Sequence, residues 1–474
     1  MVPEDQLERV IDELGVPIEE ETKIDVLRYI DDLVGHLEAW NPGERDRPSR
    51  GRWANDEYNA LLDVYEEPRQ RVSEGPLAEL TFVVKDNIAV EGLRMTCGSQ
   101  HLEAVPTDDA TVVDRLLGAG TQIIGKANMD AFAFGPGGLW SERGRVRNPI
   151  DEDRIPGGTS SGSGVAVAAG LADAALGSDT GGSIRSPAAC CGIVGLKPTH
   201  AQVSRYGLVQ NVPMADTIGP LARDVETAAR ILEAIRGPDP RDPSVAPLDA
   251  PPLHEDIDRF ESLRVGVLDV APHDVSVSVS EAMADLTSDL DAREDVTVGS
   301  IDLDLEDVGE AYTVISGAEF SWLLRQSFAV RSGVPTHPSL VDLVDGEALT
   351  DHVAGRILPG AYLDSVTDGR AYALARERGV AFARELDARF EEFDVLLTPT
   401  LRSLPPKPDQ LRATEGGFKY TIAKQFSLAG LPAVSVPFAE REGLPVSAQI
   451  LAPRFEDRTA IVGARLVERL ASTG

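Results

Sequence analysis

GGTSSGSGVAVAAGLADAALGSDTGGSIRSPAACCGIVGLKP, residues 157–198, is the stretch around which the chain is organised. Two clusters of serine and glycine, residues 157–164 and 177–183, flank a run of small apolar residues. Glycine at this density lets backbone N–H groups approach a ligand closely. Serines among such glycines indicate either a cradle for an anion or a nucleophile beside an oxyanion hole.

The sequence upstream predicts a strand–helix–strand unit. Residues 80–84 read as an apolar strand that ends at Lys85, and residues 122–124 read as a second strand. Between them, Asp109 is expected to cap a helix that runs through Leu117. This order predicts a parallel or mixed sheet. Residues 165–176 are almost all small and apolar, which is unusual for a surface helix, so they predict a buried central helix.

The chain is expected to divide into a helical extension, residues 1–70, and a large domain, residues 71–474. Leu7, Val10, Ile11 and Leu14 follow the apolar spacing of an amphipathic helix. We expect the extension to pack on a core or to mediate association, such as that of a homodimer. Further elements are expected as a helix that starts at Asp224, helices over much of 310–390, and strands at 263–268, 394–398, 433–437 and 444–451.

The charge of the chain excludes several classes of partner. The formal net charge is −33, with 78 acidic against 45 basic residues, of which only seven are lysines. Phosphates would be repelled, so neither nucleic acid nor an acidic membrane surface is expected as a partner. An acidic coat of this density predicts adaptation to high salt, which screens the self-repulsion. No signal peptide or spanning segment is recognised, so a cytoplasmic location is expected.

The cysteines suggest neither a disulfide framework nor a metal site. Cys97, Cys190 and Cys191 are the three cysteines, and their spacing fits no metal-ligand pattern. They are expected to be buried structural thiols. The sequence therefore predicts neither a metal nor another cofactor.

Three mechanisms compete for the central stretch. A phosphate-binding loop would need a G-x-x-x-x-G-K-[ST] motif or a clear G-x-G-x-x-G after a strand, and the sequence contains neither. Residues 158–162, GTSSG, match the G-x-S-x-G elbow, but a polar segment with two prolines precedes them instead of an apolar strand. The third mechanism is a serine nucleophile with a lysine base. Lys85, desolvated at the end of an apolar strand, would have a lowered pKa and could accept a proton.

These residues lie in motifs that identify a family. The motifs are VKDNI from Val84, GKANMD from Gly125, RNP from Arg147, PGG from Pro156, GSDTGGSIRSPAACCGIVGLKPT from Gly177, VSRYGLV, TIGPLAR, DVLLTPT and LAGLPAVSVP. In this order the chain resembles the amidase-signature hydrolases, which include bacterial amidases, fatty acid amide hydrolase and the A-subunit of tRNA-dependent amidotransferases. The resemblance covers residues 75–470. It implies an α/β fold with a single large domain, whose central mixed β-sheet is covered by helices on both faces.

The resemblance also implies the roles of the site residues. Ser183 would be the nucleophile and Lys85 the base. The family's bridging serine, 24 residues before the nucleophile, is replaced by Thr159, whose hydroxyl can still relay a proton; Ser160 is the alternative relay. An acyl-enzyme would form while backbone N–H groups hold the oxyanion. The expected oxyanion donors belong to Thr180, Gly181, Gly182 and Ser183.

The substrate is expected to be a small-molecule amide. In the A-subunit of the amidotransferases an arginine and an aspartate hold the head of glutamine; Arg356 matches the arginine, but Tyr420 stands at the aspartate position. Without that carboxylate the ammonium of glutamine would lack a partner, so the sequence favours a stand-alone amidase. The alternative is the A-subunit of a glutamyl- or aspartyl-tRNA amidotransferase, with its partner subunits. Phe134, in an aromatic loop, is expected to line an apolar pocket.

Overall fold

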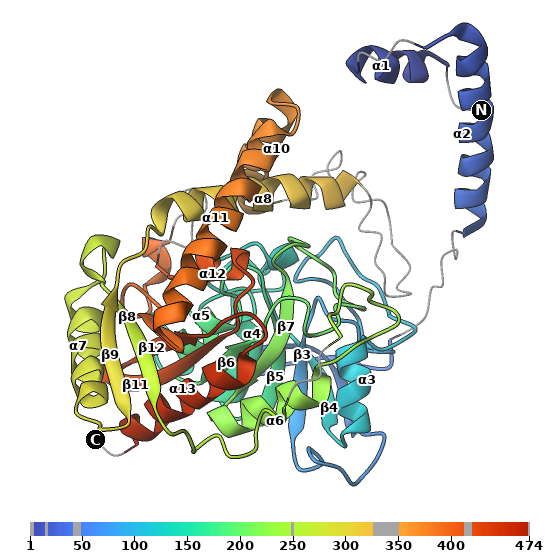
Figure 1. Ribbon diagram of the computed structural model, residues 1–474. Coiled ribbons are helices and arrows are strands. Elements are labelled where there is room, and N and C mark those ends of the chain that lie inside the picture. Colours follow the sequence, from blue (N-terminus) through green and yellow to red (C-terminus); the bar gives the residue numbers. More distant parts are fainter. Residues whose placement is uncertain are drawn as a thin grey trace. The chain divides into compact units, whose positions relative to one another are not determined.

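The computed structural model describes residues 4–14, 18–40, 49–247, 251–325, 350–411 and 420–472 (Figure 1). The chain divides into two compact units, Met1–Asp46 and Arg47–Gly474. The first contains two helices, α1 (Glu4–Leu14) and α2 (Glu20–Trp40). None of the described helices has the length and apolarity needed to cross a bilayer.

The second unit is built on a twelve-stranded mixed sheet. Across the sheet the strands are ordered β1-β2-β4-β3-β5-β7-β6-β11-β12-β10-β8-β9. β3 runs parallel to both β4 and β5, whereas β5 and β7 are antiparallel. The strands are β1 (Arg52–Trp53), β2 (Leu61–Arg69), β3 (Thr81–Lys85), β4 (Gln122–Ala127), β5 (Ala174–Asp179), β6 (Val194–Lys197), β7 (Thr217–Ala222), β8 (Leu263–Leu268), β9 (Val296–Ile301), β10 (Val395–Pro399), β11 (Ala433–Arg441) and β12 (Leu444–Leu451).

Helices cover both faces of this sheet, as expected. Alternate side chains of a strand point to opposite faces of the sheet. The apolar neighbours of two successive residues of β3 therefore show which helices cover each face. Val83 belongs to the same apolar cluster as Val165 of α4, whereas Phe82 belongs to the cluster that contains Leu116 of α3 and Leu232 of α6. The described helices of this unit are α3 (Thr111–Gly118), α4 (Ser161–Ala168), α5 (Arg185–Cys191), α6 (Val225–Ile235), α7 (Val277–Asp291), α8 (Glu306–Arg325), α10 (Asp351–Val366), α11 (Arg370–Glu392), α12 (Lys424–Leu428) and α13 (Asp457–Ala471).

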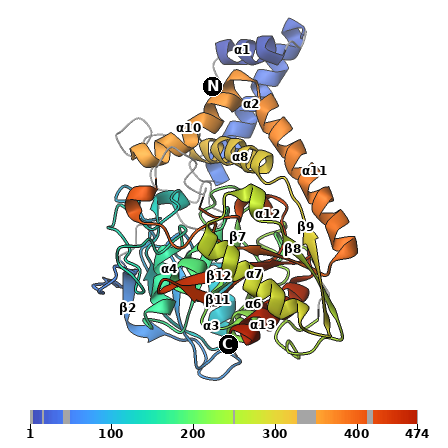
Figure 2. The same ribbon diagram turned by 90° about the vertical axis from the view of Figure 1, so that its left-hand side faces the viewer.

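The long helices α8, α10 and α11 pack on one another, and in Figures 1 and 2 they lie at the top of this unit. α8 and α10 cross with their backbones in contact, since a Cβ at Gly317 would lie 2.7 Å from the Cα of Gly360. The same helix α8 carries Tyr312, whose buried side chain reaches Gly181, two residues after the end of β5. The helical layer therefore contributes directly to the surroundings of the central stretch.

Several sequence expectations are confirmed, and three need correction. Asp224 caps α6 by accepting from the Thr227 N–H, and β8 occupies the expected residues. Residues 47–70, in contrast, belong to the second unit, where they supply β1 and β2 rather than helices. Asp109 does not cap α3, because its carboxylate binds Arg69 at 2.7 and 2.8 Å and the N–H of Glu91 at 2.9 Å.

The central helix is also shorter than expected. α4 ends at Ala168, and Gly170, with φ of +73°, turns the chain out of the helix. Residues 174–179 form β5, whose residues are all buried. Small apolar side chains suit a strand buried on both faces as well as a buried helix, so periodicity does not distinguish the two.

The packing of the sheet leaves no room for a side chain at Gly219 of β7. A Cβ there would collide with the backbone carbonyl oxygen of Leu196 in β6. We expect Gly219→Ala to lower the free energy of unfolding by about 3 kcal/mol, the upper range of overpacking, because neither strand can move aside. Denaturant unfolding in high salt measures the loss. Gly118→Ala is the control, since its Cβ would meet no atom within 4 Å at the end of α3; equal stability of the two variants would contradict the packing described.

Candidate active site

Lys85 and Asp179 are the last residues of neighbouring parallel strands, β3 and β5. The carboxyl ends of parallel strands meet at one edge of a sheet, where α/β proteins place their ligands. Thr159 lies in the turn before α4, and Ser183 lies in the turn before α5. These two turns touch, since a Cβ at Gly158 would lie 3.2 Å from the Cα of Ser183. The fold thus gathers the residues that the sequence singled out.

The Lys85 amine is completely buried. Its Nζ lies 2.7 Å from Thr159 Oγ1, 2.9 Å from Ser178 Oγ and 3.4 Å from the carbonyl oxygen of Ser178. Burial lowers the pKa of Lys85 to about 7, against the opposing effect of the nearby carboxylates of Asp179, Asp130 and Asp216. Near neutral pH a substantial fraction of this amine is therefore uncharged.

Ser160 faces the backbone of β5. Its Oγ donates to the carbonyl oxygen of Ser178 at 3.1 Å and accepts from the Ser178 N–H at 3.3 Å. Among the described contacts, no hydrogen bond joins Ser160 to Lys85, whereas Thr159 makes one. Thr159 therefore contacts Lys85, whereas Ser160 contacts the backbone of Ser178.

The loop of residues 180–183 is shaped by two buried carboxylates. Asp179 accepts from the N–H of Gly182 at 2.8 Å and of Ile184 at 3.2 Å. Asp216 accepts from the hydroxyl of Thr180 at 2.6 Å. Because the Gly182 N–H points to Asp179, the expectation that it holds an oxyanion needs correction; the backbone N–H groups of Thr180, Gly181 and Ser183 remain candidates.

Two glycines in this loop have structural reasons to be glycine. Gly182 has φ of +119°, a conformation that other residues rarely adopt. A Cβ at Gly181 would lie 2.6 Å from the phenol oxygen of Tyr312. Tyr312 was not singled out from the sequence, because an isolated tyrosine on a predicted helix carries no signal of its partner.

Arg185 and Asp179 form a fully buried ion pair, with Arg185 Nη2 2.9 Å from Asp179 Oδ1. Burial disfavours the charged carboxylate, yet the Arg185 guanidinium holds the pKa of Asp179 at about 2. Arg185 also donates to Gln449 at 2.9 Å and to Ser427 at 2.6 Å. The pair ties the loop to β12 and α12.

The residues expected to bind substrate have separate surroundings. Phe134 is buried and packs edge-on against Phe320 at 4.3 Å between ring centroids. The buried phenol of Tyr420 accepts from the Gly158 N–H at 3.1 Å and donates to the carbonyl oxygen of Pro136. Arg356 lies on α10, where burial lowers its pKa and the nearby Tyr312 raises it. Tyr420 therefore fastens the turn that carries Thr159.

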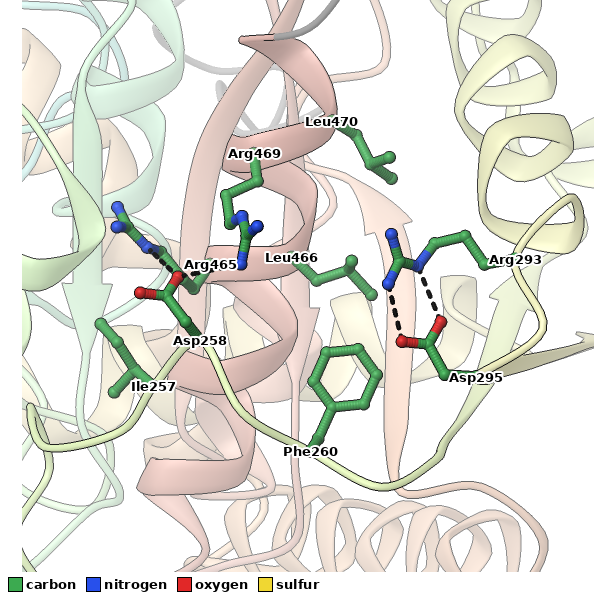
Figure 3. A pocket seen from close by; sticks show the side chains of 9 residues that line it. All are labelled: Ile257, Asp258, Phe260, Arg293, Asp295, Arg465, Leu466, Arg469 and Leu470. Atoms are coloured by element: carbon green, nitrogen blue, oxygen red, sulfur yellow. Dashed lines mark hydrogen bonds and ion pairs between the residues drawn. The ribbon is translucent and has the colours of Figure 1, made fainter.

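A small hollow elsewhere in the unit does not belong to this site (Figure 3). It has a volume of about 160 Å³ and lies beside α13. Figure 3 shows its arginines turned toward carboxylates, and Arg293 and Arg465 pair with Asp295 and Asp258 at 2.7 and 2.9 Å. In the described residues, no group of His, Cys, Asp and Glu is arranged to hold a metal ion.

Comparisons with known proteins show the family to which the chain belongs. The family model described as "Amidase" matches residues 55–461. The A-subunit of the glutamyl-tRNA(Gln) amidotransferase of Halobacterium salinarum is 39% identical over 84% of this chain and 97% of that protein. The corresponding A-subunit of Symbiobacterium thermophilum is 42% identical over 81% of each.

Solved structures show a similar fold. The glutamyl-tRNA(Gln) amidotransferase A-subunit of Thermotoga maritima superposes with a TM-score of 0.73 at 33% identity, covering 86% of this chain and 87% of that one. The peptide amidase of Stenotrophomonas maltophilia superposes with a TM-score of 0.70 at 30% identity, covering 85% and 84%.

The buried ion pair predicts a large cost for its disruption. Asp179→Asn leaves the Arg185 guanidinium buried without a counter-charge, so we expect the free energy of unfolding to fall by about 3–5 kcal/mol. Denaturant unfolding at pH 7 measures it. Asp295→Asn is the matched control, because its partner Arg293 is 37% exposed and such pairs contribute at most about 1 kcal/mol. Similar small losses in both variants would contradict a structural role for the buried pair.

Proposed function

The chain belongs to the amidase family, and on that premise we propose that it hydrolyses the C–N bond of carboxylic amides with Ser183 as nucleophile, Lys85 as base and Thr159 as the relay between them. The observation that carries this proposal is the 2.7 Å distance between Lys85 Nζ and Thr159 Oγ1 in a fully buried setting. A base must be neutral before it accepts a proton, and burial favours the neutral amine. The contacts of Ser160 with the Ser178 backbone support Thr159 over Ser160 as the relay.

In the proposed reaction, neutral Lys85 takes the proton of the Thr159 hydroxyl while Thr159 takes that of Ser183. Ser183 Oγ bonds to the amide carbon, and the carbonyl oxygen becomes an oxyanion held by the N–H groups of Thr180, Gly181 and Ser183. The proton returns through Thr159 to the leaving nitrogen, the C–N bond breaks, and an acyl-enzyme remains. Water then attacks the acyl carbon by the same relay and releases the carboxylate.

A serine-reactive fluorophosphonate tests the nucleophile and its base. We expect labelling at Ser183, with a rate that rises as pH rises through about 7, because the pKa of Lys85 is about 7 and only the neutral amine accepts a proton. Lys85→Ala should slow labelling by a factor of about 10² or more, whereas exposed Lys407→Ala should not. Labelling at Ser160, or an unchanged rate in Lys85→Ala, would overturn the assignment.

The relatives support glutamine as the source of the amide and partner subunits as the receivers of ammonia. The curated relatives reported above are the A-subunits of glutamyl-tRNA(Gln) amidotransferases. This supports the amidotransferase interpretation better than the stand-alone amidase that the sequence favours. We therefore propose that the chain releases ammonia from glutamine for an amidotransferase.

A stand-alone amidase is the second candidate, and Tyr420 favours it. The position at which the resemblance implies an aspartate carries a buried phenol, which is bonded to Gly158 and Pro136. A neutral phenol engaged in this way cannot balance the ammonium of glutamine. The peptide amidase among the solved structures has a similar fold, which supports an amide other than glutamine as substrate.

Substrate preference distinguishes the two candidates. For the purified chain in molar potassium chloride, we expect ammonia release from glutamine to exceed that from hexanamide and benzamide by about tenfold or more, since a site that binds a polar head group discriminates against its absence. A coupled ammonia assay measures the rates. Preference for the simple amides would overturn the glutamine proposal and favour the second candidate.

A further inference from the structure

We infer that Ser178 is a positioning residue that turns the lone pair of the Lys85 amine toward Thr159. The inference rests on the proposed function, because it concerns how the base of that reaction is oriented. Ser178 lies in β5, one residue before Asp179, and its side chain is buried. Ser178 is not among the site residues expected from the sequence.

The contacts of the amine fix its orientation. A neutral amine has two N–H groups and one lone pair, so two acceptors on one side determine the direction of the lone pair. Ser178 supplies both acceptors, its Oγ at 2.9 Å and its carbonyl oxygen at 3.4 Å from Nζ. Among the residues that the structure describes, the third hydrogen-bond neighbour of Nζ is Thr159 Oγ1 at 2.7 Å. The lone pair therefore faces the hydroxyl whose proton it must accept.

Asn87 donates a hydrogen bond to the Ser178 hydroxyl. Its Nδ2 lies 3.2 Å from Ser178 Oγ and 3.4 Å from the carbonyl oxygen of Val209. A carbonyl oxygen can only accept, so the nitrogen end of the amide must face this side. The Asn87 amide thus donates to Ser178 Oγ, which uses its two lone pairs for Asn87 and Lys85.

Ser160 completes the arrangement by holding the backbone of Ser178. Its hydroxyl bonds to both the N–H and the carbonyl oxygen of that residue. β7 holds the other edge of β5, where Ser178 pairs with Ile218. The second residue of the Thr-Ser pair therefore acts on the base through Ser178, while the threonine contacts the base directly.

The charged groups around Lys85 set the direction of a pH test. Asp179 of β5 and Asp130, Asp216 and Cys97 from neighbouring segments all favour the ammonium form, which burial opposes. The ammonium has three N–H groups, and Ser178 accepts from it more strongly than from the neutral amine. Removing Ser178 Oγ should therefore lower the pKa of Lys85 further.

Ser178→Ala, assayed by fluorophosphonate labelling of Ser183 across pH, tests the inference. We expect the plateau rate to fall by about 10- to 100-fold, because the base is misdirected. We also expect the midpoint of the rise to move to lower pH by about half a unit or more. Ser178→Thr keeps the hydroxyl and should restore the midpoint. Asn87→Ala, which frees the Ser178 hydroxyl, should lower the plateau in the same direction and serves if Ser178→Ala does not fold.

Ser163→Ala is the matched control. The buried Ser163 hydroxyl donates to the carbonyl oxygen of Leu176 in β5, the strand that also carries Ser178, and makes no described contact with Lys85. This variant should leave plateau and midpoint unchanged. An unchanged plateau in Ser178→Ala, or a lower plateau with an unmoved midpoint, would overturn the inference. Absence of Ser183 labelling in the unsubstituted protein would instead overturn the proposed function, so the two failures are distinguishable.

Discussion

The burial of one amine at the end of β3 is the constraint on which the site depends. An ammonium removed from water is costly unless it is paired or bonded, and the alternative is loss of its proton. The structure surrounds Lys85 with hydroxyl and carbonyl oxygens and keeps its nearest carboxylates occupied with other donors. Asp179 is balanced by Arg185, so the amine meets no dedicated counter-ion among the described residues. This balance leaves the amine poised between its two protonation states.

The scarcity of lysine makes this pattern clearer. Of the lysines that the structure describes, Lys85, Lys126 and Lys197 are completely buried. Lys126 Nζ donates to the carbonyl oxygens of Ile88 at 2.6 Å and Asp86 at 3.2 Å. It therefore fixes the turn that directly follows Lys85.

The family resemblance predicts Lys85, Thr159 and Ser183 as site residues, and the fold brings the segments that carry them together. The sequence also predicts a mixed sheet covered on both faces, which the structure confirms. It was insufficient where burial erases periodicity. Ala174 to Leu176 were expected in a helix, because a strand buried on both faces shows no alternation. That error concealed Ser178, which meets Lys85 only because β5 lies beside β3. Contacts such as Tyr312 with Gly181 join segments that are distant in the chain, and no local pattern announces them.

Lys85 must be neutral when it acts as a base, and an NMR titration of protein labelled with nitrogen-15 at the lysine Nζ measures its protonation state. With only seven lysines, Lys85→Met assigns the resonance. We predict that this resonance titrates with a midpoint near pH 7, because burial lowers the pKa of Lys85 to about 7. A Lys85 resonance that titrates only near pH 10, the ordinary pKa of lysine, would contradict a neutral Lys85 base.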